Sequence, residues 1–570
     1  MNRRTRALTT SGALVVLLTA CSGGADPSTP DAATTAGSPT VPGPTTPQEP
    51  EETTSEPTED RSALGAYGVS SGHPLASAAG MAMLARGGSA VDAAIAAAFA
   101  DGVMQPASSG IGGGGATIVV SEGEAVHYDY REVVNTVGQV PEDGVGVPGF
   151  VAGLEELHGE YGVLPWEDLL APAIDIAEEG APVSGYLAAS IASPIGQAVT
   201  GGLPHFLSAD GLPLQEGDLL IQADLAEAMR QIAADPDTVY TGALSERLLQ
   251  VPGLDAETFE NYEVQVSSPP EGQVGDYTML SGAPALPGAA IIQMVQVAEA
   301  AGIGDVDPDS ADFVDLQSQA WQVADASVQE YFGDPDFVDV PVEELTDADS
   351  NADIAAALAG GASASAASAL EDPYLGAANT THISVVDADG TAVSMTNTIT
   401  NYWGSGRYVA GFFLNDQLER FWDIGVADAN LPQPGRRSVT WSSPSMVLDA
   451  QRRPVLVIGT PGGRHIPNTT ASVITRWALH DQDLAEAIPG ERFLLTGGVL
   501  WLESATLAED LAALGYDARA VDPAILANFG SVQALDVDWK NREVTSFADE
   551  RRSAGYSVAT EEDPAPQTGP

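Results

Sequence analysis

The sequence feature that most constrains the fold is a β-hairpin pattern that begins directly after Thr380. Residues 381–386 and 391–396 are two runs rich in β-branched residues, joined by an acidic turn at 387–390 that ends in glycine. β-Branched side chains favour extended strands, and a short turn of Asp and Gly reverses the chain direction. We therefore expect an antiparallel pair of strands here, with Thr380 at the start of the first strand.

Helix and strand patterns alternate on both sides of this hairpin. Residues 76–84 and 90–100 have helix-forming composition, whereas residues 116–120 are rich in β-branched side chains. Residues 215–332 are expected to be mainly helical between Gly/Pro-rich turns. Further strands are expected at 445–448 and 455–458. Mixed elements in this order favour sheets covered by helices, in the α/β (α+β) class.

The Asn379–Thr380 step has a specific chemical interpretation. Residues 349–379 are rich in Ala, Ser and Gly without a clear period, and we expect an exposed segment that leads to a processing site. A threonine at a chain terminus has its own base, the free α-amine, with a pKa of about 7.7 to 8.0. Only cleavage before Thr380 would create that amine. By itself the step is a weak signal, because threonines at the start of a strand are common β-branched filler.

Other chemistries lack their usual patterns. The seven histidines, at 73, 127, 158, 205, 382, 465 and 480, do not have the paired spacing of a zinc site. The glycine-rich run at 110–115 is followed by a strand pattern instead of the helix that a dinucleotide site needs. The sequence therefore predicts no metal and no nucleotide cofactor.

The chain is strongly acidic. It has 80 Asp and Glu against 22 Lys and Arg, a net charge of −58, and Lys540 is the only lysine. Phosphate binding needs a basic face, so a nucleic-acid partner is not expected. The acidity is interpreted as a solvated surface.

The N-terminus is interpreted as a targeting segment. Arg3, Arg4 and Arg6 precede an apolar run at 12–20 that is too short to span a membrane. The letters LTAC at 18–21 resemble a bacterial lipobox, and Cys21 is the only cysteine of the chain. We expect residues 1–20 to be a signal peptide and Cys21 to be lipidated at the cell surface or in the periplasm. The alternative is an ordinary secretory signal.

Two terminal segments lack apolar residues to bury. Residues 21–62 are rich in Pro, Thr, Ser and Glu and are expected to form a disordered tether. Residues 561–570 have a similar composition and are expected to form a disordered tail.

The chain from about residue 66 to about residue 535 resembles the gamma-glutamyltransferase (glutathione hydrolase) family. Its first part has, in family order, SGHPLAS at 71–77, GGSAVDAA at 87–94, SSGIGGGG at 108–115, VPGFVAG at 147–153, LPW at 164–166 and GDPDFVDVP at 333–341. Its second part has TTHISVVD at 380–387, GSG at 404–406, LN at 414–415 and GTPGG at 459–463.

This resemblance implies a four-layer αββα sandwich of the N-terminal-nucleophile hydrolase type. A large subunit, 63–379, and a small subunit, 380–560, would arise when one precursor is cut between Asn379 and Thr380. The resemblance also implies secretion and no cofactor. The expected partners are the two subunits themselves and a small γ-glutamyl or related acyl-amide substrate.

The resemblance assigns roles to matching residues. Thr380 matches the family nucleophile, and Thr398 matches the threonine whose hydroxyl supports it. Gly462 and Gly463 match the pair whose N–H groups form the oxyanion hole. Arg131 matches the arginine that binds the α-carboxylate of the donor, which a planar guanidinium can do with two hydrogen bonds.

The donor pocket departs from the family pattern, although Gln417 is retained. Thr400, followed by Asn401, stands where the family usually has asparagine, and the usual serine pair is replaced by Thr440 and Trp441. The position of the acidic residue that binds the donor's α-ammonium falls on Arg420, and neighbouring Glu419 and Asp416 are the alternatives if the register is shifted.

Three functions follow from these observations. The first is a γ-glutamyl hydrolase or transferase that acts on glutathione or γ-glutamyl peptides. The second is an acylase for glutaryl or polyglutamyl amides, favoured by Arg420. The third is a binding lipoprotein without catalysis, which the retention of Thr380, Thr398 and the glycine pair argues against.

Overall fold

The computed structural model describes residues 63–360, 378–424 and 428–569. The predicted signal peptide and tether, including Cys21, lie outside the described residues. Among the helices of the described ranges, none is long and apolar enough to cross a membrane.

Two antiparallel sheets form the centre of the fold. The first has the order β21-β20-β1-β9-β10-β2-β3-β6 and the second β19-β18-β14-β13-β8-β7. The strands of the first sheet are β1 (Ala66–Ser71), β2 (Gly114–Ser121), β3 (Glu124–Asp129), β6 (Gln265–Ser267), β9 (Ala378–Val386), β10 (Ala392–Asn401), β20 (Gly555–Thr560) and β21 (Gln567–Gly569). Those of the second are β7 (Glu271–Val274), β8 (Tyr277–Ser281), β13 (Ser445–Leu448), β14 (Pro454–Gly459), β18 (Gln533–Asp538) and β19 (Glu543–Thr545).

Small sheets lie outside this centre. They pair β4 (Ala181–Pro182) with β5 (Leu219–Leu220), β11 (Tyr408–Val409) with β12 (Phe412–Phe413), and β15 (Phe493–Thr496) with β16 (Val499–Leu502) and β17 (Asp517–Ala520).

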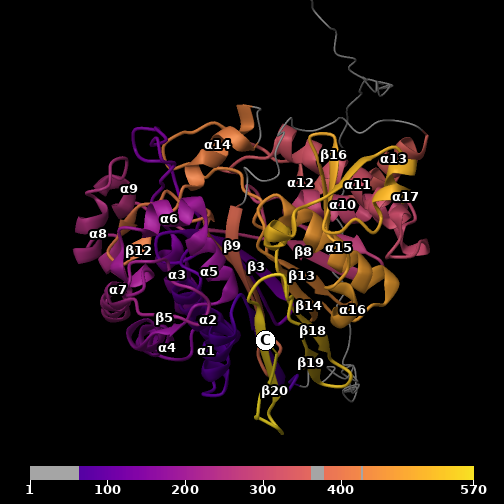
Figure 1. Ribbon diagram of the computed structural model, residues 1–570. Helices are drawn as coiled ribbons and strands as arrows, with labels where there is room; N and C mark the ends of the chain where they lie inside the picture. The colour runs from indigo at the N-terminus through magenta and orange to yellow at the C-terminus, as the bar shows by residue number, and fades with distance from the viewer. Residues whose placement is uncertain (1–62, 361–377, 425–427, 570) are drawn as a thin grey trace, which may run out of the picture. The chain divides into compact units, whose positions relative to one another are not determined.

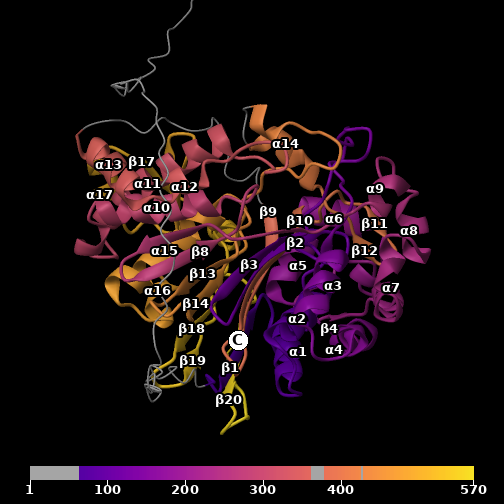
Figure 2. The same ribbon diagram turned by 180° about the vertical axis from the view of Figure 1, so that it is seen from behind.

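Helices cover the outer faces of both central sheets. On the first sheet lie α1 (Pro74–Leu84), α2 (Ala90–Met104) and α3 (Phe150–Tyr161), with α4 (Trp166–Glu179), α5 (Gly185–Ala192), α6 (Pro194–Thr200), α7 (Ala223–Ala234), α8 (Ala243–Leu248) and α9 (Ala256–Glu260) around them. On the second lie α10 (Gly288–Ala300) and α15 (His465–His480), with α11 (Ala311–Tyr331), α12 (Val342–Leu345), α13 (Ala348–Ala359), α16 (Leu484–Ala487) and α17 (Ala508–Ala513). Figures 1 and 2 show the two helical groups on opposite sides of the strands.

The layers are held by three apolar cores. One lies between the first sheet and α1–α4, and another between the second sheet and α10, α11 and α15. The third lies between the two sheets and includes Ile118, Val386, Met446 and Val457. The predicted four-layer αββα sandwich is therefore confirmed.

Strand alternation in β9 orients the predicted nucleophile. Ile383 and Val385 face the helices, whereas the His382 ring lies against Gly459 of the second sheet and the Ser384 hydroxyl donates to the carbonyl of Gln533. Successive side chains in a strand point to opposite faces. Thr380 has the same parity as His382 and therefore points toward the second sheet.

The expected hairpin is confirmed by β9 and β10. Its turn is closed by Asp387, whose Oδ1 accepts from the N–H groups of Asp389 and Thr391. Gly390 has φ +89°, a conformation that glycine adopts without steric cost.

Three sequence expectations need correction. The tail is not wholly disordered, because β21 (Gln567–Gly569) pairs with β20 and covers its open edge. Part of the expected exposed segment forms α13, whose Ala-rich sequence follows an N-cap at Asp347; residues 361–377 lie outside the described residues. The stretch 215–332 also contains β6, β7 and β8, which are too short to show a clear period.

Candidate active site

Asn379 and Thr380 lie within one continuous strand, β9, and both are buried. The Thr380 hydroxyl donates to the Thr398 hydroxyl (3.2 Å), which in turn donates to the carbonyl oxygen of Asn379 (2.6 Å). The Thr398 hydroxyl thus contacts both the predicted nucleophile, Thr380, and the oxygen of the carbonyl group that Thr380 would attack. A donor aimed at that oxygen stabilises the negative charge that develops during attack.

A β-bulge in β10 places Thr398. The pairing with β9 shifts between Asn397 and Thr400, next to the Asn379–Thr380 bond. Thr400 has φ +84°, which β-branched residues rarely adopt, and its N–H donates to the Thr398 hydroxyl over 2.8 Å. Bulges re-aim side chains beside active sites, and backbone strain collects there. The bulge therefore orients Thr398 and leaves the backbone of Thr400 strained.

Gly462 and Gly463 lie in the loop between β14 and the N-terminus of α15. Their φ angles of +133° and +56° are conformations that favour glycine. Within the described ranges, neither N–H group donates to another residue. A helix N-terminus also favours negative charge nearby. These features are compatible with the oxyanion role predicted for the pair.

A pocket with an empty volume of about 220 Å³ lies against these groups. It is lined by Thr380, Thr398, Thr400, Gln417, Arg420, Thr440, Trp441, Ser442, Gly463 and Ile466. Gly462 is not among the lining residues but directly precedes Gly463. We call Thr380, Thr398 and the Gly462–Gly463 pair the cleavage side, and Thr400, Gln417, Arg420, Thr440 and Trp441 the donor side. Across the described ranges, no group of three His, Cys, Asp or Glu residues is arranged to hold a metal ion.

Gln417 connects the donor side to the interior. It lies in the 3-10 helix η4 (Gln417–Glu419), and its Oε1 accepts from the Thr400 hydroxyl over 2.6 Å. Its Nε2 donates to the Ser438 hydroxyl over 2.9 Å. Both ends of the amide are thus fixed by hydroxyl groups.

Arg420 lies at the start of α14 (Arg420–Asp423) and lines the pocket, whereas Asp416 and Glu419 do not. Its guanidinium donates to Asn401 Oδ1 over 2.7 Å, and Asn401 Nδ2 donates to Asp416 Oδ2 over 2.6 Å. Burial raises the pKa of Asp416, against the opposing effects of the Asn401 N–H and the Arg420 charge. The pocket is therefore lined by a guanidinium at the position where the resemblance predicts an acid.

Trp441 forms an apolar part of the donor side. Its ring lies 5.8 Å from that of Trp321, and the Arg464 guanidinium lies 5.5 Å from it. Arg464 directly follows Gly463 and pairs with Asp325 over 2.6 Å. The Trp441 indole has a single N–H donor and no hydroxyl, so it cannot replace the hydrogen bonds of a serine.

Arg131 is fully buried and is not among the residues that line the pocket. Its Nε and Nη2 donate to the two oxygens of Asp129 (3.0 and 2.6 Å), and its Nη1 donates to the carbonyl of Ser438 (2.6 Å). Burial would raise the pKa of Asp129, but the charges of Arg131 and Arg437 hold it below its usual value. In this structure Arg131 supports the Ser438–Gln417 contact, and its carboxylate-binding role stays a prediction.

The Thr398 hydroxyl thus contacts the Asn379 carbonyl and lines one pocket together with Gly463. Residues 76–559 match the model described as gamma-glutamyltranspeptidase. The chain belongs to the gamma-glutamyltranspeptidase family.

Named relatives share most of their length with this gamma-glutamyltranspeptidase chain. The capsule biosynthesis protein CapD proenzyme of Bacillus anthracis is 32% identical over 86% of the chain and 90% of its own length. The glutathione hydrolase proenzyme of Pseudomonas aeruginosa is 32% identical over 81% and 90%, respectively. The acylase ACY 1 proenzyme of Pseudomonas sp. strain SE83 is 32% identical over 80% and 88%. All three are proenzymes by name.

Two contacts of the cleavage site were missed by the sequence analysis of this family member. Tyr186 and Arg552 both reach the Asn379 side chain, from residues outside the motifs that the resemblance rests on. Ser442 and Ile466 are additional lining residues. The one sequence signal for Arg552 is that basic residues are rare in this chain, 22 in 570.

Proposed function

We propose that the chain cuts itself between Asn379 and Thr380 and then acts as a γ-glutamyl hydrolase or transferase through an acyl-enzyme on Thr380. The observation that supports this most is the Thr398 hydroxyl, which contacts both the Thr380 hydroxyl and the Asn379 carbonyl oxygen. Membership of the gamma-glutamyltranspeptidase family establishes the enzyme class.

Self-cleavage proceeds in two steps. Thr380 Oγ1 attacks the carbonyl carbon of Asn379, and Thr398 stabilises the charge on the carbonyl oxygen. The C–N bond breaks, the proton of the Thr380 hydroxyl ends on the Thr380 nitrogen, and an ester joins the two residues. Water then hydrolyses the ester, which leaves a carboxylate on Asn379 and a free amine and hydroxyl on Thr380.

Turnover uses the new α-amine as the base. The amine accepts the hydroxyl proton while Thr380 Oγ1 attacks the donor amide, and the N–H groups of Gly462 and Gly463 stabilise the oxyanion. The donor's amine leaves with a proton. Water or an acceptor amine then attacks the acyl ester, which gives hydrolysis or transfer.

Glutathione and γ-glutamyl peptides are the proposed donors, in line with the glutathione hydrolase relative. A second candidate is a glutaryl or polyglutamyl amide, because Arg420 lines the pocket. Two like charges about 4 Å apart repel by roughly 4 kcal/mol at an effective dielectric near 20, so a guanidinium disfavours the donor's α-ammonium. The same guanidinium would attract a second carboxylate.

The experiment measures aniline release from γ-glutamyl and glutaryl anilides by the purified, processed enzyme. We expect release from at least one of the two, with acetyl anilide as a control that stays intact. A processed enzyme that releases aniline from neither donor would contradict the proposed function and favour a binding lipoprotein.

We also propose that the enzyme is extracytoplasmic and held to the membrane by a lipid on Cys21. The segment before Cys21 has the charge and apolar pattern of a lipoprotein signal. The Cys21→Ser variant should leave the membrane fraction or fail to mature. A variant that stays with the membrane after a high-salt wash would show that another feature holds it there.

A further inference from the structure

The Asn379 side chain is held by four hydrogen bonds, although the chemistry at its carbonyl does not require its amide. Its Oδ1 accepts from the Tyr186 hydroxyl (2.7 Å) and from Arg552 Nη1 (3.0 Å). Its Nδ2 donates to the carbonyl of Ala107 (3.2 Å), and Oδ1 also accepts from the Thr380 N–H (3.1 Å). A side chain with this many fixed contacts also fixes the backbone carbonyl next to it.

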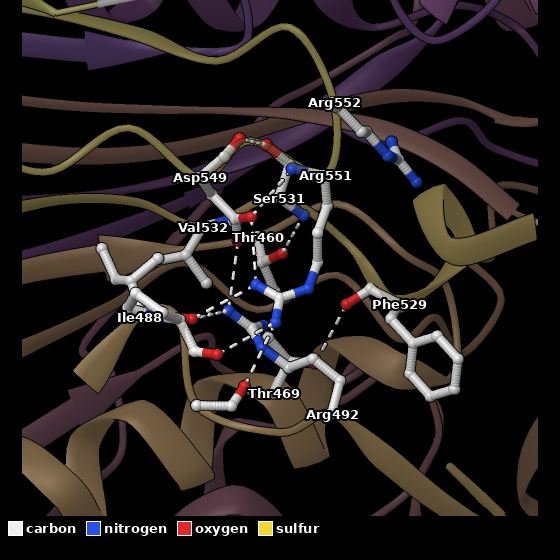
Figure 3. Close-up of polar contacts among 12 residues, drawn as sticks. Thr460, Thr469, Ile488, Arg492, Phe529, Ser531, Val532, Asp549, Arg551 and Arg552 are labelled. Carbon is white, nitrogen blue, oxygen red and sulfur yellow. Dashed lines mark hydrogen bonds and ion pairs between the residues drawn. The ribbon is translucent and has the colours of Figure 1, made fainter. Parts of the chain in front are cut away.

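Arg552 reaches this amide from a rigidly anchored segment. The neighbouring Asp549 accepts from Arg492 Nη2 (3.1 Å), from the Val532 N–H (2.8 Å) and from Arg551. Figure 3 shows Arg492 and Arg551 directed into this cluster, whereas the Arg552 side chain points away from it. Arg552 Nε donates to the carbonyl of Ala527 (2.8 Å), which leaves Nη1 directed at Asn379.

Tyr186 supports the same contact from the large-subunit part of the chain. It lies at the start of α5, and the Arg552 guanidinium lies over its ring at 5.0 Å from the centroid. Its hydroxyl is also 3.0 Å from that of Tyr402. The guanidinium and the phenol are therefore packed together on the Asn379 amide.

We propose that Tyr186 and Arg552 are positioning residues for self-cleavage, which act by holding the Asn379 amide so that its carbonyl stays in line with Thr380 and Thr398. Neither side chain contacts the Thr380 hydroxyl in the described contacts. Arg552 Nη1 also lies 3.5 Å from the Thr380 carbonyl oxygen, which is a weaker contact than the 3.0 Å one to Asn379, so the main effect passes through Asn379. Near-attack geometry tolerates little displacement, and a misplacement of about 1 Å can cost about 100-fold in rate. The proposal rests on the proposed cleavage at Thr380.

The test follows the loss of precursor on denaturing gels after cell-free synthesis of the full chain. Arg552→Met should slow cleavage by about tenfold to a hundredfold, and Tyr186→Phe by about tenfold, because hydrogen bonds to charged groups are the stronger ones. Arg476→Met and Tyr240→Phe are the matched controls. Both remove buried groups whose hydrogen bonds go to Pro308 and Pro148 and not to Asn379, so cleavage should stay within about twofold of the wild type.

A double-mutant cycle separates positioning from general stability. In the Asn379→Ala background the amide is absent, so Arg552→Met and Tyr186→Phe should add almost no further slowing. Slowing that adds in full in this background would overturn the proposal, as would wild-type rates in the single variants. If thermal melting shows that Arg552→Met is not folded, the cycle of Tyr186→Phe with Asn379→Ala tests the proposal by itself.

The wild type distinguishes this inference from the function on which it rests. A wild-type chain that never yields two fragments would contradict self-cleavage itself. A wild type that is cut, together with Tyr186→Phe and Arg552→Met variants that are cut equally fast, would contradict only the positioning role.

Discussion

The cleavage side and the donor side of one pocket are built from different parts of the fold. Thr380 and Thr398 lie on adjacent strands of the first sheet, and Gly462 and Gly463 lie before a 16-residue helix. The donor side lies mainly on the connections between β10 and β13, which include the short helices η4 and α14. Loops vary more readily than the sheets and helices that they connect.

The difference between the cleavage side and the donor side matches the places where the sequence departs from the family pattern. The resemblance matches all of the predicted cleavage-side residues to the family pattern, whereas it predicts departures at Thr400, Arg420, Thr440 and Trp441. On the cleavage side the geometry depends on strand pairing and glycine backbone, which a substitution on the donor side does not alter. On the donor side it depends on side chains, so the same backbone can accept another donor. The chemistry and the choice of donor should therefore be separable by mutation.

The largest expected effect is that of Thr380→Ala. Without the hydroxyl neither the Asn379 carbonyl nor a donor can be attacked, so the variant should remain a single chain and release no aniline. Thr380→Ser keeps the hydroxyl and should still be cut. If Thr380→Ala still yields two fragments, Thr380 is not the nucleophile and the cleavage side is wrongly assigned.

Thr398→Val should have the next largest effect. Valine keeps the shape of threonine but removes the donor to Asn379, and loss of one oxyanion donor typically slows a reaction by about 10² to 10³. Cleavage of the precursor on a timed gel measures this. Thr440→Val is the matched donor-side control and should be cut at the wild-type rate; equal slowing in both would remove the distinction between the two sides.

Arg420→Asp should change the donor and leave self-cleavage intact. Removing the guanidinium and adding a carboxylate should raise the ratio of kcat/KM for γ-glutamyl over glutaryl anilide by at least about tenfold, equivalent to about 1.4 kcal/mol. Glu419→Gln is the control, because Glu419 does not line the pocket. An unchanged ratio in Arg420→Asp would show that Arg420 does not select the donor.

The smallest expected effect on the chemistry is that of Glu132→Gln, which should alter stability. Burial raises the pKa of Glu132 from 4.5 to about 8, and among the described residues its carboxyl group has no hydrogen bond to another side chain. The folded protein therefore keeps a proton that the unfolded chain releases, and the stability of the wild type falls as the pH rises from about 4.5 to 8.

Glu132→Gln cannot ionise, so its stability relative to the wild type should grow by up to about 1.4 kcal/mol per pH unit in that range. Denaturant unfolding at pH 5, 6.5 and 8 measures the difference. A difference that does not change with pH would show that Glu132 is ionised in the folded protein.

Local patterns were sufficient to predict much of the fold. The β9–β10 hairpin was predicted because β-branched runs and an Asp/Gly turn act within a few residues. The strands β6, β7 and β8 were missed because three to five residues show no reliable period. The strand β21 was missed because its stability comes from the edge of β20 and not from its own composition.

The site was predicted as far as ordered motifs reach. Most of the predicted residues meet in one pocket, but Arg131 does not line it and is held in an ion pair with Asp129. Tyr186 and Arg552 are separated from Asn379 by 193 and 173 residues, so no local pattern could bring them together. Contacts of this kind depend on the complete fold.

The most direct test of the account is the N-terminal sequence of the smaller fragment of the purified wild-type enzyme. The account predicts a fragment that begins Thr380-Thr381-His382, because the hydroxyl that attacks Asn379 becomes the terminal nucleophile. A fragment that begins at any other residue, or a chain that stays whole while it releases aniline, would contradict the assignment of Thr380.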